Sequence, residues 1–513
     1  MNIYLIKKGI KEIILEKKFI LLLLGFNILG LLLRLIWVKY GHINLFAEEA
    51  QYWLWSKNLD LSYYSKPPLI SFVNFLSTSL MGNTEFGVRI NAMVIGFILP
   101  ILIFQFSKIL FHSERIAFFA AIILMVMPFY NIISLVFTTD SLVVLFWLLT
   151  QIYLFKAFKT NRLKFWLFAG VFLGFANLSK STALLFYPAI IFYLFFYKRE
   201  LISTKGFCVF ILTSVLIISP VIIWLAKNNW VTLKHLLALS GIQKDNFSMI
   251  RSLHNLGEYI IGQILVLSPF FLGIVYLIVK KSSKVQILQI KENLRYLLFP
   301  LVFVWLFFFF VSIKKIEVNW LFFAYPSIAI LLSYSYVRLY AERNLYISLV
   351  ATATIVILFL FPRVFDLLGV SDLYPPKIDT IHRMYGWQEL GNYVSSLAEK
   401  DKQKKIFIFS DSYQVSSELA FYVVNNPQTY CINIGRRMNQ FDLWKGLDQF
   451  DNQEYNAIYV SSEVASQNIL NSFIGPINHY VFNTSYRKKF PIQYHIYYLT
   501  GYKKFSNEII NRF

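Results

Sequence analysis

The fold class is indicated most clearly by residues 19–38, which read FILLLLGFNILGLLLRLIWV. A second run of this kind, IAFFAAIILMVMPFYNIISLVF, occupies residues 116–137. Each has close to the roughly 20 apolar residues that an α-helix needs to cross a bilayer. Of the 513 residues, 57% are hydrophobic and only 15% are charged. A single soluble core could not hide so much apolar surface. The sequence therefore predicts a multi-pass α-helical membrane protein.

The apolar runs predict about eleven transmembrane helices. They cover residues 19–38, 90–110, 116–137, 141–157, 164–179, 181–197, 206–226, 257–279, 296–312, 319–337 and 345–362. The two runs that flank Lys180 are short for a crossing. The first run is long and is not followed by a small-residue cleavage site, so we expect it to act as a signal anchor.

The basic residues predict the topology of these helices. The 49 Lys and Arg outnumber the 28 Asp and Glu, which gives a net charge of +21. Many of them gather in the segment 1–18 and in the loops at 156–164 and 280–295. Because cytoplasmic loops are enriched in Lys and Arg, residues 1–18 are predicted to be cytoplasmic and the C-terminal tail to lie outside. This topology explains the charge without a nucleic-acid partner, and a composition typical of AT-rich bacterial genomes favours a bacterial inner (plasma) membrane.

The chain is predicted to have a membrane part and a soluble part. The transmembrane domain covers residues 19–365 and carries two long outer loops, 41–89 and 227–256. The first loop contains PPLISFVNFLSTSL, which we interpret as an interfacial helix. In the tail, KKIFIFS, TYCINI and NAIYVS are β-type runs, and SSELAFYVV is helix-like. Residues 375–513 are therefore expected to form a small extracytoplasmic α/β domain.

The first outer loop holds the strongest candidates for chemistry. Glu48 and Glu49 follow the first span, where a carboxylate could act as general base on an incoming hydroxyl. Adjacent helical residues point about 100° apart, so both are not expected to serve one proton. Lys66 precedes two prolines, which stiffen the backbone and could hold its ammonium toward a phosphate. The alternative is a hydrated loop whose tyrosines and tryptophans form an interfacial aromatic belt.

Other candidates lie at the ends of later spans. Asp140 could bind a metal or a polar group of a substrate, or could be the N-cap of the helix that begins SLVVLFW. Lys180 is a functional candidate if it lies at membrane depth, but is simply solvated if it lies in an outer turn. Asn319 and Trp320 begin a span, and Trp320 could be an interfacial anchor.

A further set could contact an acceptor. In the second outer loop these are Asn228, Trp230 and His235, with a solvated loop position as the alternative for His235. In the tail, surface pairing is the alternative to acceptor contact for Arg436, Arg437, Asp442 and Trp444.

Eight segments resemble, in order, the GT-C glycosyltransferases of family 39, which include protein O-mannosyltransferases and lipid A aminoarabinose transferases. The most extended is EEAQYWLWSKNLDLSYYSKPPL, residues 48–69, with its acidic pair, aromatic residues and Lys-Pro-Pro. The others are GVRI at 87–90, FTTDSL at 137–142, GFANLSKSTALL at 174–185, KKIEVNWLFFAYP at 314–326, YGWQELG from 385, ELAFY from 418 and GRRMNQFDLW from 435. The resemblance thus covers nearly the whole chain.

The resemblance implies a GT-C fold and transfer, with inversion, of a sugar from a polyprenyl-phosphate carrier to a lipid, glycan or protein acceptor on the outer membrane face. It implies that Glu48 is the base, that Lys66 and Lys315 pair with phosphate, and that Arg89 does the same or pairs structurally. It also places Trp320 beside the donor. The first acid of the pair is usually Asp in this family and is Glu48 here, a displacement of about 1 Å that could cost roughly a hundredfold in rate.

The resemblance implies no required cofactor, because the phosphate ester is itself the leaving group. A divalent cation held by Asp140 and Glu48 stays open, since no His/Asp cluster has clear ligand spacing. Two other classes of function compete with a transferase. A lipid-sugar transporter or flippase would be expected to show inverted repeats and broken helices, and an inactive membrane scaffold could follow from the Asp-to-Glu change.

Overall fold

The computed structural model describes the chain in two compact units. Residues outside the description are 1–2, 42, 240–247, 274–290, 316, 340, 371, 373–374, 376–378, 401–403, 452–454, 488–489 and 506–513. The first unit, here the helical unit, comprises Met1–Trp37, Arg89–Ala226 and Leu237–Ile357. The second, here the α/β unit, comprises Val38–Val88, Lys227–Leu236 and Leu358–Phe513. The chain therefore enters the α/β unit three times.

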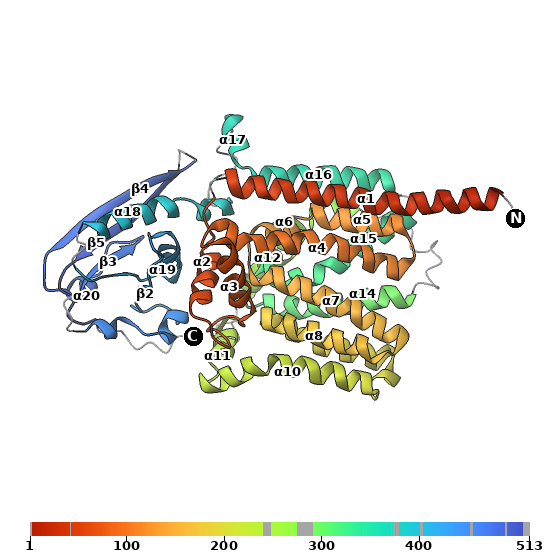
Figure 1. The fold of residues 1–513 in the computed structure, drawn as a ribbon, viewed down its shortest axis with the longest axis horizontal. Coiled ribbons are helices and arrows are strands. Elements are labelled where there is room, and N and C mark those ends of the chain that lie inside the picture. The colour runs from red at the N-terminus through yellow and green to blue at the C-terminus, as the bar shows by residue number, and fades with distance from the viewer. Residues whose placement is uncertain are drawn as a thin grey trace. The chain divides into compact units, whose positions relative to one another are not determined.

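The helical unit is built from long apolar helices that run side by side (Figure 1). They are α1 (Ile3–Tyr40), α4 (Glu85–Phe111), α5 (Glu114–Val126), α6 (Pro128–Leu135), α7 (Thr139–Thr160), α8 (Leu163–Ser179), α9 (Phe186–Tyr197), α10 (Lys205–Lys227), α12 (Met249–Leu267), α14 (Lys291–Ser312), α15 (Tyr325–Arg338) and α16 (Glu342–Leu360). Short 3₁₀ turns precede some of them, including η1 (Ser181–Leu185) before α9 and η5 (Val318–Ala324) before α15.

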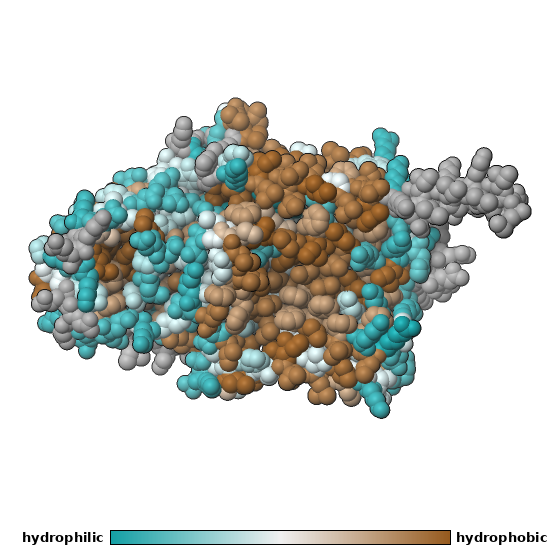
Figure 2. Space-filling model, viewed as in Figure 1, coloured by the Kyte–Doolittle hydropathy of each residue, from teal (hydrophilic) through white to brown (hydrophobic). Residues whose placement is uncertain are grey.

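Hydropathy supports a membrane location for the helical unit. Figure 2 shows hydrophobic residues gathered over its visible face. Among the described residues, seven helices are long and apolar enough to cross a membrane, or eight if the bent pair α5 and α6 is one span. The shorter helices that flank Lys180 are also apolar. The multi-pass α-helical fold is thus confirmed, whereas the number of eleven crossings stays a prediction, partly because residues 274–279 of one expected span lie outside the description.

One expected span is broken. The run 116–137 was predicted to be continuous, but α5 and α6 meet at Met127 with a bend of 69°. Met127 is extended, with φ −61° and ψ 134°, and Pro128 opens the next helix. A proline ring disfavours the helical conformation in the residue before it and has no N–H to donate. The Met-Pro pair in the middle of the run explains the break.

The α/β unit contains one five-stranded sheet. Its strands are β1 (Ile406–Ser410), β2 (Thr429–Cys431), β3 (Asn456–Ser461), β4 (Ile477–Tyr486) and β5 (Phe490–Leu499), in the order β2-β1-β3-β5-β4. The first three are parallel, whereas β5 and β4 are antiparallel to their neighbours. The three predicted β-type runs correspond to β1, β2 and β3. β1 and β3 are almost wholly buried, as expected for strands inside a parallel sheet.

The helices of this unit come from all three parts of its chain. They are α2 (Ala47–Lys57), α3 (Leu69–Met81), α11 (Val231–Leu239), α17 (Arg363–Leu367), α18 (Trp387–Glu399), α19 (Tyr413–Tyr422) and α20 (Gln467–Leu470), with the 3₁₀ turns η7 (Thr380–Met384), η8 (Gln440–Leu443) and η9 (Leu447–Phe450). α3 confirms the helix expected in the first outer loop, and its interfacial position stays a prediction.

The first outer loop is joined to the tail by specific contacts. The Leu45 N–H donates to the Tyr422 hydroxyl over 2.6 Å, and the Trp53 and Phe421 rings meet edge to face at 4.9 Å. Trp53 is 1% exposed and Trp55 is fully buried. The alternative of an interfacial aromatic belt is therefore wrong for Trp53 and Trp55, because segments of the same unit cover them.

A close approach inside this unit gives a stability prediction. A Cβ at Gly391 of α18 would lie 2.6 Å from both the Tyr422 carbonyl oxygen and its Cβ. Backbone cannot give way cheaply, so Gly391→Ala is expected to destabilise the α/β unit by about 1–3 kcal/mol. Limited proteolysis of the full chain in detergent would measure this, with the exposed position Ser396→Ala of the same helix as control. Equal resistance of the two variants would contradict the close packing.

Candidate functional site

The two acidic residues at the start of α2, Glu48 and Glu49, have different surroundings. The Glu49 carboxylate accepts the Phe46 N–H over 3.0 Å, and the Glu49 side chain is fully buried. It therefore satisfies one of the free N–H groups at the helix start. Glu48 points elsewhere because consecutive helical residues diverge by about 100°. Glu49 thus stabilises the helix start and Glu48 is the better candidate for the base, while a catalytic role for either residue stays a prediction.

Glu48 lies in an environment that disfavours its charge. Burial raises the pKa of the Glu48 carboxyl above its ordinary value, and the nearby charge of Glu49 adds to this. The cations Lys66 and Arg383 act in the opposite direction and lower that pKa. Raised carboxyl pKa values of this origin are typical of groups that exchange protons in catalysis. The Lys66 charge thus acts on Glu48, as a shared site for a base and a phosphate would require.

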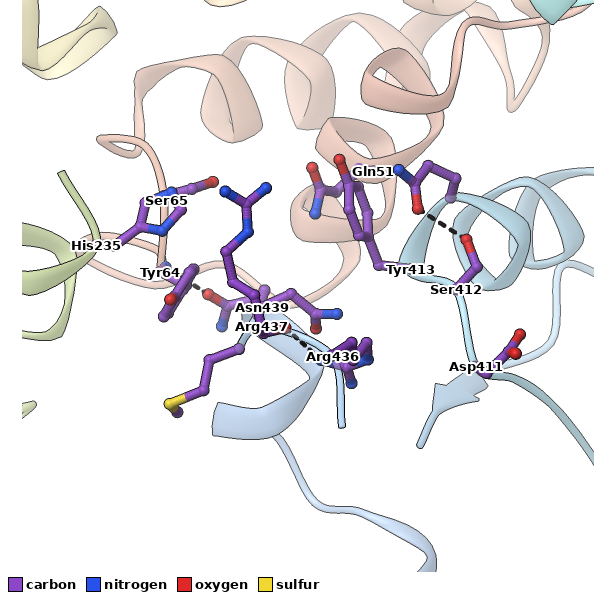
Figure 3. Close-up of a pocket in the computed structure, with 13 residues that line it drawn as sticks. Gln51, Tyr64, Ser65, His235, Asp411, Ser412, Tyr413, Arg436, Arg437 and Asn439 are labelled. Atoms are coloured by element: carbon purple, nitrogen blue, oxygen red, sulfur yellow. Dashed lines mark hydrogen bonds between the residues drawn. The ribbon is translucent and has the colours of Figure 1, made fainter. Parts of the chain in front are cut away.

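A pocket of about 330 Å³ opens beside this face of α2. Gln51 lies three residues after Glu48 and therefore on the same side of α2. Its side chain lines the pocket. Figure 3 shows side chains from four separate segments around the space. The lining residues are Gln51, Tyr64, Ser65, His235, Asp411, Ser412, Tyr413, Gln414, Arg436, Arg437, Met438, Asn439 and Gln440.

Tyr413 connects the pocket to Glu48. Its hydroxyl pKa is raised to about 12, first by burial and then by the negative charge of Glu48, while the Arg437 cation opposes the rise. Tyr413 therefore remains a neutral O–H group at neutral pH, and the charges of both Glu48 and Arg437 act on it. Figure 3 shows its ring beside Gln51.

The candidates for acceptor contact have different surroundings. His235 is 6% exposed and lies with its ring centre 4.6 Å from that of Tyr64, so the solvated alternative is wrong. Arg436 holds both carboxylate oxygens of Asp442 at 2.7 and 3.0 Å, which is structural pairing. Arg437 lines the pocket.

The three remaining candidates, Asn228, Trp230 and Trp444, are not among the residues that line the pocket. The Trp444 ring packs on Phe441 at 5.4 Å. In the second outer loop Trp230 is 45% exposed, and Asn228 accepts the Val231 N–H through its carbonyl.

In the helical unit, three candidates from separate motifs form one cluster. The Lys180 ammonium is 2.6 Å from one carboxylate oxygen of Asp140, and the Asn319 amide donates to the other over 3.1 Å. Lys180 is 3% exposed and Asp140 is 5% exposed. The solvated alternative for Lys180 is therefore wrong. The N-cap of α7 is Thr138, whose hydroxyl accepts the Asp140 N–H, so the prediction of Asp140 as N-cap is also wrong.

This cluster does not fit a divalent cation at Asp140. Both carboxylate oxygens already bind a cation or an amide N–H, and a buried ammonium beside them repels a metal ion. No group of three His, Cys, Asp or Glu among the described residues could hold a metal. We therefore derive no step through a metal ion.

The other candidates of the helical unit have separate surroundings. Arg89 is fully buried, with its guanidinium carbon 5.5 Å from the centre of the Trp37 ring. Lys315 pairs with Glu317 at 3.2 Å on the surface. Trp320 packs on Phe308, with the ring centres 5.6 Å apart. A phosphate-binding role for Arg89 or Lys315 stays a prediction.

Several pocket residues were missed from the sequence. Gln51 could have been found from its three-residue spacing from Glu48. Tyr64 was considered only under the alternative of an aromatic belt, and its 2% exposure depends on the rest of the unit. Nothing in the sequence marks Tyr413, which the fold places in the lining of the pocket.

The family model for dolichyl-phosphate-mannose-protein mannosyltransferase matches residues 65–224. The chain is 25% identical to lipid A galacturonosyltransferase RgtD of Rhizobium johnstonii, over 49% of this chain and 51% of that protein. It is 24% identical to undecaprenyl phosphate-alpha-4-amino-4-deoxy-L-arabinose arabinosyl transferase 2 of Proteus mirabilis, over 31% of this chain and 30% of that protein. The matches thus span about half and about a third of these relatives.

The fold is similar to that of ArnT from Cupriavidus metallidurans. The apo structure matches with a TM-score of 0.60 over 94% of this chain and 98% of that one, at 11% identity. The structure of the same protein bound to undecaprenyl phosphate matches with a TM-score of 0.59 at 12% identity, over 93% of this chain and 97% of that one. These likenesses confirm the predicted fold class.

Proposed function

We propose, on the premise that this chain is a GT-C glycosyltransferase resembling glycosyltransferase family 39, that it moves a sugar from a polyprenyl-phosphate carrier to an acceptor hydroxyl or phosphate. The carrying observation is Glu48, a half-buried carboxylate with a raised pKa on which the Lys66 charge acts, three residues before Gln51 in the lining of the pocket. A base, a cation for a phosphate and space for a saccharide are what this reaction requires. The named activities of the relatives, lipid A galacturonosyl transfer and aminoarabinosyl transfer, support the same class.

The reaction follows from these groups. The Glu48 carboxylate takes the proton of the acceptor as the acceptor oxygen attacks the anomeric carbon. The bond from that carbon to the phosphate oxygen breaks on the opposite side, so the configuration inverts and polyprenyl phosphate leaves as an anion. The Lys66 ammonium stabilises the charge that develops on the phosphate. No cofactor is required, because the phosphate ester supplies the leaving group.

The location of the reaction is part of the proposal. The basic segment 1–18 is on the cytoplasmic side of a bacterial inner membrane, and residues 375–513 are on the outer side, in agreement with the positive-inside rule. The acceptor is a lipid, a glycan or a protein at the outer surface. The donor is lipid-linked, which agrees with the assignment of α2 and α3 to the same unit as the pocket.

The test is transfer of radiolabelled sugar by the purified full chain from a panel of polyprenyl-phosphate sugars to membrane acceptors. Transfer from at least one donor supports the proposal. Absence of transfer from every donor, with intact folded protein, would contradict it and would favour the transporter or the inactive scaffold. Uptake of a labelled lipid-sugar across vesicles without transfer would favour the transporter.

The pH dependence of the reaction tests the base. Glu48 must be ionised to accept a proton, and burial raises its pKa. The acid limb of kcat/KM is therefore expected above the ordinary glutamate range, with activity rising as the pH rises through it. Lys66 lowers the pKa of Glu48, so Lys66→Met is expected to move this limb to still higher pH.

Lys57→Met is the matched control for that shift. It removes a cation from the same helix that is not among those acting on Glu48. Its acid limb should coincide with that of wild type. An unshifted limb in Lys66→Met would show that the limb belongs to another group.

A further inference from the structure

Two adjacent arginines of the tail have opposite surroundings. Arg436 is engaged by Asp442 and by backbone carbonyls. Figure 3 shows the Arg437 side chain extending into the space between Ser65 and His235 on one side and Gln51 and Tyr413 on the other. Among the described residues, no carboxylate forms an ion pair with the Arg437 guanidinium. The pocket therefore contains a planar cation with a fork of N–H donors.

A second donor faces the same space. Tyr64 lines the pocket and is 2% exposed, and its buried hydroxyl has no hydrogen-bond partner in the described part of the chain. Leaving such a group unpaired costs about 1–3 kcal/mol, so a ligand atom is its natural partner. Burial raises the pKa of this hydroxyl to about 12, and the charge of Arg437 acts on it. Tyr64 is thus a neutral O–H donor in the lining of the pocket that also contains the guanidinium.

The charged side chains that line the pocket favour an anionic ligand over a cationic one. Asp411 is the one carboxylate among the described lining residues. Its two oxygens accept hydrogen bonds from the Ser410 and Ser461 hydroxyls, each over 3.3 Å. An amino sugar would bring a second positive charge next to Arg437, whereas an anionic group would be attracted to it.

We infer that the pocket binds an oxyanion of the saccharide substrate, a carboxylate or a phosphate, between the Arg437 guanidinium and the Tyr64 hydroxyl. The substrate is therefore an anionic sugar. The rings of Tyr64 and Tyr413 provide apolar surfaces for a pyranose, and the Gln51 amide provides donors and an acceptor for its hydroxyls. This inference rests on the proposed function and specifies its substrate class.

The experiment compares donors and acceptors that differ only in charge. Donors carry a uronic acid, its neutral hexose counterpart or an amino sugar. Acceptors carry a phosphate or lack it. Charge-assisted hydrogen bonds contribute about 1.5–3 kcal/mol, so Arg437→Gln is expected to lower kcat/KM for the anionic substrate by about 10- to 100-fold, mainly through KM. If Arg437→Gln lowers kcat/KM only for the uronic acid donor, the bound anion belongs to the donor. If it lowers kcat/KM only for the phosphorylated acceptor, the bound anion belongs to the acceptor.

Three variants make the result specific. Arg437→Lys keeps the charge without the planar fork and should recover part of the loss. Tyr64→Phe removes only the hydroxyl and should weaken the same substrate about tenfold. Lys445→Gln removes an exposed cation of the same unit that does not line the pocket, and it should leave kcat/KM unchanged for every substrate.

The outcomes separate this inference from the proposed function. If Arg437→Gln lowers kcat/KM equally for anionic, neutral and amino-sugar donors and equally for phosphorylated and unphosphorylated acceptors, the inference is overturned while the transferase stands. If wild type transfers sugar from no donor, a binding experiment tests the inference. Free hexuronate, the neutral hexose and inorganic phosphate are then titrated into the full chain. Binding of an anion that Arg437→Gln abolishes supports the pocket, and equal or absent binding overturns it.

Discussion

Replacing Glu48 with glutamine is expected to lower the rate of sugar transfer by about 10²- to 10⁴-fold, the range that a general base contributes. The amide cannot accept the acceptor proton, although it nearly preserves the size of the side chain. KM should change little, because the base acts in the transition state. The measurement is kcat and KM for the preferred donor with purified wild type and variant at matched concentration. If Glu48→Gln has a kcat close to that of wild type, Glu48 is not the general base.

Two companion variants show whether the loss is chemical. Glu48→Asp keeps a carboxylate but withdraws it by about 1 Å, so its loss should be smaller than that of the amide and at most roughly a hundredfold. Glu49→Gln changes the neighbouring acid, which holds the start of α2 through the Phe46 N–H. That variant should affect thermal stability more than the pH profile. A Glu48→Gln variant as unstable as Glu49→Gln would indicate a structural carboxylate instead.

Replacing Lys180 with methionine is expected to destabilise the helical unit by about 3–5 kcal/mol, because Asp140 is left as an uncompensated buried charge. The pair is 2.6 Å apart, with side chains 4% and 7% exposed. Denaturant titration of the full chain in detergent would measure this loss in the free energy of unfolding. The surface pair of Lys159 and Glu292, with side chains 43% and 46% exposed, gives the control, since Lys159→Met should cost at most about 1 kcal/mol.

A double-variant cycle isolates the coupling within this cluster. Asp140→Asn removes the carboxylate charge that Lys180→Met would leave unpaired. The double variant should therefore lose less stability than the sum of the two single variants. Recovery of stability without recovery of transfer would assign a role in the reaction to the pair. A Lys180→Met variant no less stable than Lys159→Met would show that the ion pair does not hold the helices.

The features that sequence reasoning predicted well are those set by local pattern. Long apolar runs predicted the multi-pass fold because a helix in lipid must satisfy its own backbone. The strands β1 and β3 were predicted because both of their faces are buried and apolar. The strands β4 and β5 were missed, since β4 alternates between exposed and half-buried positions and its polar residues resemble a loop.

The features that failed are those set by distant partners. Trp53 and Trp55 have the composition of an interfacial belt, yet the tail of the same unit covers Trp53 through Phe421. The importance of Asp140, Lys180 and Asn319 was indicated by three separate motifs, but their mutual contacts depend on how α7, α8 and η5 pack. The direction of the Arg437 side chain depends on the turn that follows β2.

The α/β unit is built from three separate segments of the chain, so a nascent chain can complete this unit only after the last segment has been synthesised. The Leu45 N–H and the Tyr422 hydroxyl that bind each other are 377 residues apart. At about 5–20 residues per second, α2 and α3 must wait tens of seconds before the ribosome has made the residues that cover them. Their tryptophans and tyrosines therefore need a temporary partner during synthesis, such as lipid or a chaperone. Truncation before α19 is accordingly expected to leave the first outer loop as a target for quality-control proteases.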